Sequence, residues 1–86
     1  MIEMSSRAKR DLKRIGPGTN RARIVESLRT LAAGAGNLDV KALEGRSPWL
    51  RLRVGDFRIL YRPVEDGYLV ARIVNRRDLD RTVGSL

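Results

Sequence analysis

The sequence predicts an α+β domain in two layers, with an N-terminal helical hairpin packed on an antiparallel β-meander. Three observations lead to this prediction. Up to residue 32, apolar residues recur every three or four positions, which is typical of amphipathic helices. From residue 49 onward, apolar and polar residues alternate, which is typical of strands with one buried face. Pairs of Gly and Asp interrupt this alternation twice, where tight hairpins would connect the strands.

The N-terminal part is expected to form the first helix. Residues 1–4 can form a brief edge strand, and the helix should follow over residues 5–15. Ser5 or Ser6 can cap its first turn. The Gly-Pro-Gly run at residues 16–18 should stop it. Its apolar stripe consists of Ala8, Leu12 and Ile15.

A second helix is expected to begin at Thr19 or Asn20, either of which can cap it, and to end near Gly34. The two helices then form a hairpin with one apolar side. Residues 34–48 are expected to be a glycine-rich connection with a few apolar anchors. The apolar stripe of the second helix consists of Ile24, Val25, Leu28, Leu31 and Ala32.

Three strands are expected in the second half of the chain. Residues 50–54 and 57–62 flank Gly55-Asp56, a pair that suits a type II′ turn. Asp66-Gly67 should form a second tight turn, of type I′, before a strand over residues 68–74. The polar segment after this strand can add one helical turn.

Side chains alternate between the two faces of a strand, so the sequence also assigns each strand residue to a face. The face under the helices should hold Leu50, Leu52, Val54, Phe57, Ile59, Tyr61, Leu69, Ala71 and Ile73. The opposite face should present five arginines, namely Arg51, Arg53, Arg58, Arg62 and Arg72. By the same alternation, this face should also hold Trp49, Leu60, Tyr68 and Val70. A single β-bulge would reverse part of this assignment.

Arginines on neighbouring strands favour a site for a polyanion. Like charges side by side repel, and a guanidinium holds phosphate by two parallel hydrogen bonds. Trp49 and Tyr68 could stack on unpaired bases, although Trp49 can equally pack against the preceding connection. A solvated sheet face without a partner is the alternative interpretation.

Composition narrows the possible chemistry. The 86 residues suffice for one domain, and the formal net charge of +8 favours polyanionic partners. The absence of cysteine and histidine excludes disulfides, thiolate nucleophiles and the usual general acid/base at neutral pH. No metal site or cofactor is therefore expected. Without an apolar run of membrane-spanning length or a signal-peptide core, a cytoplasmic protein with no membrane partner is expected.

Two blocks of the sequence resemble the RelE/ParE superfamily of bacterial toxins, and in particular its RelE-like branch. The more specific block is "ALEG…PWLRLRVGDFRILYRP…YLVARIVNRRD", and "SSRAKRDLKRI" is similar to the first helix of that family. The resemblance implies a single RelE-like toxin domain over residues 1–86. It also implies a ribosome-dependent mRNA endoribonuclease, an mRNA interferase that inhibits translation and arrests growth.

The resemblance also implies which residues form the site. Catalytic roles fall to Arg58, Arg51, Arg76 and Arg77, with charge stabilisation by arginine during attack of the RNA 2′-hydroxyl. The basic residues expected to bind RNA are Arg53, Arg62, Arg72, Arg46 and Lys41.

The tail of the chain departs from the family pattern. Asn75 stands where many relatives have His or Lys, and Asp80, or Val83 in another alignment, stands where they have a tyrosine. Glu44 replaces a basic residue. Asp78 or Asp80 could act as a base, or each could be a helix cap or ion-pair partner.

The resemblance implies a set of partners as well. These are a cognate acidic antitoxin, in a heterotetramer or higher complex, and mRNA on the ribosome. Operator DNA would be contacted only through the antitoxin. Two alternatives remain open, a ParE-like inhibitor of DNA gyrase and a catalytically weak toxin that mainly binds its antitoxin.

Overall fold

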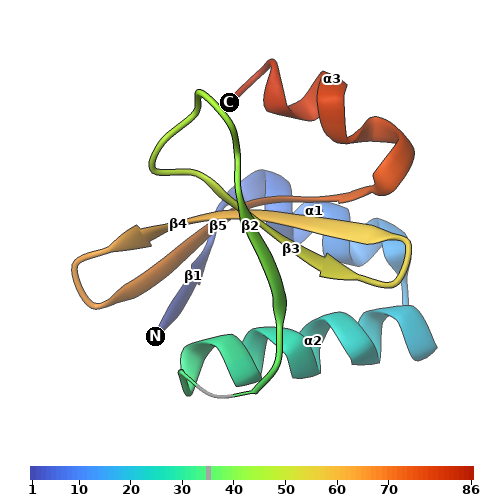
Figure 1. The fold of residues 1–86 in the computed structure, drawn as a ribbon. Coiled ribbons are helices and arrows are strands. Elements are labelled where there is room, and N and C mark those ends of the chain that lie inside the picture. The colour runs from blue at the N-terminus through green and yellow to red at the C-terminus, as the bar shows by residue number, and fades with distance from the viewer. Residues whose placement is uncertain (35) are drawn as a thin grey trace.

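A computed structural model describes residues 1–34 and 36–86 (Figure 1). Its elements are β1 (Ile2–Met4), α1 (Ser6–Ile15), α2 (Thr19–Ala32), β2 (Asp39–Ala42), β3 (Leu50–Val54), β4 (Phe57–Val64), β5 (Gly67–Asn75), the 3₁₀ turn η1 (Arg76–Asp78) and α3 (Leu79–Val83). Within the described residues, the strands form one sheet in the order β1-β5-β4-β3-β2. β1 pairs with β5 in parallel, and the other neighbours are antiparallel. The α+β class, the helical hairpin and the meander β3-β4-β5 are confirmed.

Helices pack on both faces of the sheet. In Figure 1, α2 lies below the sheet, α3 lies above it, and α1 runs behind it along β5. The main core lies between the helical hairpin and the sheet, and consists of Ala8, Ile24, Leu28, Leu31, Leu52, Val54, Ile59, Tyr61, Val70 and Ile73. None of the helices in the described parts of the chain has the length and apolar character needed to cross a membrane.

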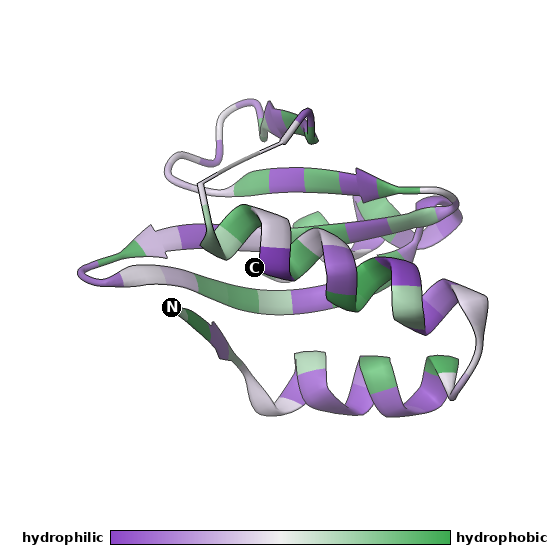
Figure 2. Cartoon of the chain, turned by 90° about the horizontal axis from the view of Figure 1, so that it is seen from below, coloured by the Kyte–Doolittle hydropathy of each residue, from purple (hydrophilic) through white to green (hydrophobic). Residues whose placement is uncertain are grey.

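The start of α1 is fixed by Ser5, as the sequence predicts. Its Oγ accepts a hydrogen bond from the Ala8 N–H at 3.0 Å and donates one to the Ala71 carbonyl at 2.6 Å. The Ser5 N–H also donates to the Val70 carbonyl at 2.9 Å. The cap therefore attaches α1 to the edge of β5. Figure 2 shows the hydrophobic residues of α1 on the side toward the sheet and hydrophilic residues outside.

The predicted cap of α2 is wrong. Gly18 occupies the N-cap position, and neither Thr19 nor Asn20 caps the helix with its side chain. The physical reason lies in the backbone, because Gly18 has a φ of 141°. Only glycine adopts this conformation readily, so the chain turns at Gly18 and the helix already includes Thr19.

The connection expected over residues 34–48 contains a strand that the sequence did not predict. β2 pairs with β3 at the edge of the sheet, with Asp39 opposite Arg53 and Ala42 opposite Leu50. All four of its residues are exposed, and Val40 is 40% exposed. Its polar and apolar residues alternate over only four positions within a glycine-rich connection, which is too short a pattern to distinguish a strand from a loop.

The first predicted hairpin is confirmed, and the second is displaced by one residue. Val54 pairs with Phe57, which leaves Gly55-Asp56 as the turn. In the second hairpin Val64 pairs with Gly67, so the turn consists of residues 65–66. Gly67 begins β5 instead, and only glycine fits at this position because a Cβ would collide with the backbone of Met1 beside it.

A β-bulge changes which residues of β5 face the core. Leu60 pairs with Arg72, but the next residue, Tyr61, pairs with Val70, so Ala71 is the extra residue. The residues of β5 before the bulge therefore face the opposite side of the sheet from the one that simple alternation predicts. Val70 is fully buried in the core and Tyr68 packs against it, whereas both were expected beside the arginines.

The bulge also removes two residues from the predicted core face. Leu69 now lies opposite Arg62, on the arginine side of the sheet, and Ala71 pairs with nothing on β4. Leu60 keeps the expected face but is completely buried. The middle of that face is therefore covered, and α3 and the segment 43–49 lie on this side of the sheet (Figure 1).

Candidate functional site

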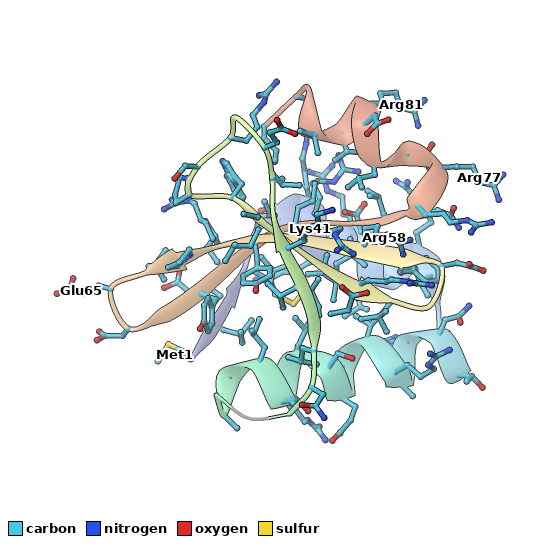
Figure 3. The ribbon with its side chains drawn as sticks, viewed as in Figure 1. Met1, Lys41, Arg58, Glu65, Arg77 and Arg81 are labelled. Atoms are coloured by element: carbon cyan, nitrogen blue, oxygen red, sulfur yellow. The ribbon has the colours of Figure 1, made fainter. Side chains whose placement is uncertain are left out.

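Basic side chains from three neighbouring strands meet on the sheet face opposite α2. The register places Arg53 opposite both Arg58 on β4 and Asp39 on β2. Arg51 lies opposite Lys41. Directly paired residues share a face, so these side chains form one group, which we call the arginine cluster: Lys41, Arg51, Arg53 and Arg58. Figure 3 labels two members of this cluster, Lys41 of β2 and Arg58 of β4.

Arg58 lies at the centre of this cluster and is held in place. Its Nη1 donates hydrogen bonds to the carbonyls of Gly55 at 2.9 Å and Phe57 at 3.0 Å. Partial burial lowers the pKa of Arg58, and the charges of Arg53, Arg51 and Arg76 lower it further. The same repulsion that disfavours the cation would be relieved by a bound anion. The structure therefore concentrates positive charge at a fixed guanidinium.

A carboxylate on the unpredicted strand β2 partly neutralises the cluster. Asp39 lies 3.3 Å from Nη2 of Arg51 and 3.8 Å from Nη1 of Arg53. One negative charge thus faces two arginines, and Asp39 orients both guanidinium groups. Asp39 was not predicted as a site residue, and the short alternation in Asp-Val-Lys-Ala is the one weak signal for it.

The two arginines after β5 point in different directions. The Arg76 N–H donates to the Asp56 carbonyl at 2.8 Å, and its Nε lies 3.9 Å from the Asp56 carboxylate. Because Arg76 also lowers the pKa of Arg58, it belongs beside the cluster. Arg77 instead donates from Nε to Asn75 Oδ1 at 3.3 Å and points outward, away from Arg58 (Figure 3).

Arg62 and Arg46 lie at the other end of the site. The Arg62 guanidinium is 5.7 Å from the centre of the Trp49 ring, a cation–π geometry. The Trp49 N–H donates to the Arg46 carbonyl at 2.8 Å, and its carbonyl accepts from Leu43. Trp49 is thus bound to the preceding connection, as one of the two interpretations expected. It could present a base-stacking surface only together with Arg62.

Arg72 does not join the cluster. Its Nε and Nη2 donate to the two oxygens of Asp11 at 2.8 and 3.2 Å, and the Ile73 N–H donates to the same carboxylate at 2.9 Å. The Asp11 side chain is 5% exposed, and its hydrogen bond raises the pKa of Arg72. The register keeps Arg72 on the face predicted for it, opposite Leu60, but its guanidinium is bound to Asp11 and is not open to a ligand. The sequence carried a signal for this, because Asp11 is the one acidic residue in the segment 5–15 and lies next to its apolar stripe.

The tail aspartates lie in α3 and at its start. Asp78 pairs with Arg81 at 2.8 Å, and its carbonyl accepts from Thr82. This arrangement agrees with the ion-pair interpretation of Asp78. Asp80 is exposed in the first turn of α3, and Asn75 accepts the Arg77 N–H at 3.2 Å. Residues 1–34 and 36–86 hold no cluster of three His, Cys, Asp or Glu side chains that could bind a metal ion.

The fold is shared with chains of solved toxin–antitoxin complexes. A chain of the RelB–RelE antitoxin–toxin complex from Methanococcus jannaschii has a TM-score of 0.74 at 25% identity, over 93% of this chain and 96% of that one. A chain of the E. coli DinJ–YafQ complex has a TM-score of 0.75 at 14% identity, over 92% and 96%. An archaeal RelE–RelB complex from Pyrococcus horikoshii gives 0.69 at 21% identity, over 87% and 92%. The architecture is therefore the α+β fold of RelE-like toxins.

Sequence comparison agrees with this class. The relative called "Putative toxin RelE1" from Methanocaldococcus jannaschii is 29% identical over 80 residues, which are 90% of this chain and 89% of the relative. A family model described as the ParE toxin of the type II toxin–antitoxin system parDE matches residues 2–79. The chain belongs to this ParE toxin family, within the RelE/ParE superfamily that its sequence resembles. It is a RelE-like toxin of a type II toxin–antitoxin system.

Proposed function

We propose that this toxin is a ribosome-dependent endoribonuclease that cleaves mRNA and so inhibits translation. The observation that supports it is the arginine cluster, in which a partly buried Arg58 is surrounded by Arg51, Arg53 and Arg76. Such a cluster fits a phosphodiester better than an uncharged substrate. The family and the RelE-like fold are consistent with this activity.

The proposed chemistry uses the nucleophile that RNA already carries. The 2′-hydroxyl attacks the adjacent phosphorus, a cyclic 2′,3′-phosphate forms, and the bond to the 5′-oxygen breaks. Arg58 and Arg51 would bind the phosphate oxygens as negative charge develops, and Arg76 would add a third charge from the edge. Arginine is a poor proton donor or acceptor because its pKa lies above about 12. The 2′-hydroxyl proton and the proton for the leaving oxygen are therefore exchanged with solvent or ribosomal groups.

RNA would follow the arginine face from the cluster toward Trp49. Arg53 and Lys41 of the cluster would bind neighbouring phosphates, and Arg62 with Trp49 would contact the next nucleotides. Arg46, beside Trp49, would extend this surface. Arg77 points away from Arg58 and would contact a more distant phosphate. Arg72 would support the site only indirectly, since Asp11 holds its guanidinium.

We also propose that a cognate antitoxin binds this chain, in a heterotetramer or a larger complex. Three of the solved chains with this fold, from Methanococcus jannaschii, E. coli and Pyrococcus horikoshii, come from antitoxin–toxin complexes. The net charge of +8 favours an acidic antitoxin, through which alone the toxin would contact operator DNA.

The test is cleavage of mRNA on ribosomes in a reconstituted translation mix. Arg58→Ala should lower the cleavage rate about 10²- to 10³-fold, the effect of losing one fixed donor in an oxyanion-type site. Arg58→Lys should also be slow, because a point charge does not reproduce the two-pronged donor. Arg29→Ala removes an arginine that is 76% exposed on α2 and serves as the matched control. A folded Arg58→Ala protein that cleaves as fast as the parent would show that the arginine cluster is not the active site.

A second candidate is inhibition of DNA gyrase, and one observation favours it. The family model that matches carries the ParE name, whereas the curated relative carries the RelE name. A supercoiling assay with purified gyrase distinguishes the two. Inhibition of supercoiling together with intact mRNA would select the gyrase function, and a protein inactive in both assays would be a catalytically weak toxin that mainly binds its antitoxin.

A further inference from the structure

A second basic surface lies on α1, away from the arginine cluster. Arg7, Arg10 and Arg14 line one side of a pocket, and Asp11 and Arg72 complete its wall. The three α1 arginines are all exposed. Their spacing of three and four residues places them on one side of the helix, directly beside β5. This side differs from the one that carries Ala8, Leu12 and Ile15 toward the core.

The pocket continues toward the C-terminal helix. A second pocket shares Asp11, Arg14 and Arg72 with the first and extends between β5 and α3. Arg81 of α3 also lines this second pocket. We call the two pockets together the α1–β5 groove. The arginines that line it are Arg7, Arg10, Arg14, Arg72 and Arg81.

The charges in this groove do not cancel. Arg72 is neutralised by Asp11, and Arg81 lies 2.8 Å from the Asp78 carboxylate. The ion pairs among the described residues include none of the three α1 arginines. Three positive charges therefore follow one another over about 10 Å of helix. A nucleic-acid duplex carries one negative charge per roughly 1.7 Å of its axis, so it can match them.

The chemistry of the lining selects between possible ligands. Single strands are bound by stacking on aromatic rings, and Phe57 is the one aromatic residue among those lining the two pockets. A protein partner would need an apolar interface centre, because charged residues are depleted there. Apolar residues line only the part of the groove between β5 and α3, namely Ile15, Phe57, Ile73 and Val74. The part beside Arg7 and Arg10 has none. The exposed side chains of α1 are basic apart from Ser6. Phosphate groups on a regular duplex remain the ligand that fits.

We propose that the α1–β5 groove binds the phosphate backbone of a nucleic-acid duplex through Arg7, Arg10 and Arg14. Asp11 acts as a positioning residue, because it fixes Arg72 as a rigid wall and attaches α1 to β5. This site is separate from the arginine cluster and does not depend on the reaction proposed there. It would hold the toxin on structured nucleic acid whether or not the cluster cleaves a substrate.

The test compares two double variants that remove the same charge from the same helix. Arg7→Gln/Arg10→Gln changes the groove, whereas Lys9→Gln/Lys13→Gln changes the side of α1 that lines a different pocket, with Met4 and Leu12. Binding of labelled duplexes of about 16 base pairs, one of RNA and one of DNA with the same sequence, is measured against salt concentration. Each variant is made both in the parent chain and in the Arg58→Ala background.

The groove variant should bind both duplexes on the order of tenfold or more weakly near 0.1 M salt. Its log–log salt slope should be shallower by about two, one unit for each lost phosphate contact. The lysine variant should keep the parental slope, and the difference should persist in the Arg58→Ala background. The duplex that binds more tightly identifies the natural source. Equal slopes for the two variants would overturn the proposal, because charge alone would then explain binding.

One further arm addresses a protein ligand. Binding of a poly-glutamate peptide is measured for the same variants and salt series. If the peptide binds as tightly as the duplexes and loses the same affinity in Arg7→Gln/Arg10→Gln, the groove serves an acidic protein segment and the proposal fails. Weak peptide binding that does not distinguish the two variants supports the duplex.

Discussion

At the scale of single residues, the role of each arginine depends on the charged side chains beside it. Arg72 and Arg58 have the same side-chain chemistry, but Arg72 has a buried carboxylate beside it and Arg58 has three cations. The first is therefore a structural cation, and the second is a cation that an anion would stabilise. Alternation along the strand predicts the face of an arginine. It does not predict its partner, because Asp11 is 61 residues away in the sequence.

Tyr61 gives the protein a predictable alkaline limit. Its side chain is 2% exposed and meets Tyr68 edge to face, with ring centres 5.4 Å apart. Burial raises the pKa of Tyr61 above its ordinary value of 10.0, and Tyr68 adds to the shift. Because the folded pKa is the higher one, the stabilisation is complete below about pH 10 and is lost as the pH rises through the folded value.

We therefore expect the free energy of unfolding of the parent to fall above about pH 10, and this fall to be smaller in Tyr61→Phe. Urea unfolding at several alkaline pH values measures both proteins. Phenylalanine keeps the packing of the ring and removes the ionisable hydroxyl, so the comparison isolates the titration. Identical pH profiles for the two proteins would mean that Tyr61 does not set the alkaline limit.

A substitution at Asp80 tests which residue of this chain aligns with the C-terminal tyrosine of relatives. If it occupies the position of their tyrosine, Asp80→Tyr should increase mRNA cleavage on ribosomes, by up to about 10²-fold, the smaller effect typical of a positioned proton-transfer group. Asp80 is exposed in α3, so the change should not disturb the core. Val83→Tyr is the matched comparison for the other alignment. A rate that stays equal or falls in Asp80→Tyr would show that the alignment is wrong or that Asp80 has its own role.

At the scale of elements, the sequence predicts well where hydrophobic periodicity is strong. The helical hairpin, the Gly55-Asp56 turn and the final helical turn all follow local patterns. The bulge at Ala71 could not be predicted, because it depends on how β5 pairs on both sides rather than on its own alternation. The strand β2 was missed because its alternation spans only four residues and none of them is buried. Of these two features, β2 brings Asp39 to the arginine cluster, and the bulge moves Tyr68 and Val70 to the core face.

The attachment of α1 to β5 depends on Asp11, which gives a stability prediction. Asp11→Ala removes three hydrogen bonds and leaves Arg72 without its partner. We expect a loss of about 2–3 kcal/mol in the free energy of unfolding, since the Arg72 side chain is 22% exposed and water can solvate part of it. Denaturant unfolding measures this loss.

The control for this prediction is Lys13→Ala on the same helix, which should change stability by about 0.5 kcal/mol or less because Lys13 is exposed. Adding Arg72→Met to Asp11→Ala should recover part of the loss, since no unpaired cation then remains. If Asp11→Ala costs no more than Lys13→Ala, the carboxylate does not hold the two elements together.

At the scale of the whole molecule, positive charge is divided between two surfaces on one small domain. The arginine cluster lies on the face opposite α2, and the α1–β5 groove lies along the edge of the same sheet. A duplex held in the groove would leave the cluster accessible to a neighbouring single strand. The net charge of +8 is thus distributed so that binding and chemistry can occur at different places.

The same charge makes the association with an acidic antitoxin dependent on salt. Long-range attraction accelerates encounter at low ionic strength and fades as the Debye length falls from about 30 Å at 0.01 M to about 3 Å at 1 M. We expect the association rate to fall about tenfold or more over this range in stopped-flow measurements. Arg53→Ala/Arg58→Ala should flatten the dependence if the antitoxin covers the arginine cluster, whereas Lys9→Ala/Lys13→Ala should flatten it if the antitoxin lies along the helices. A rate that does not change with salt, while binding stays tight, would mean that apolar contacts alone hold the complex and that the arginine cluster stays free.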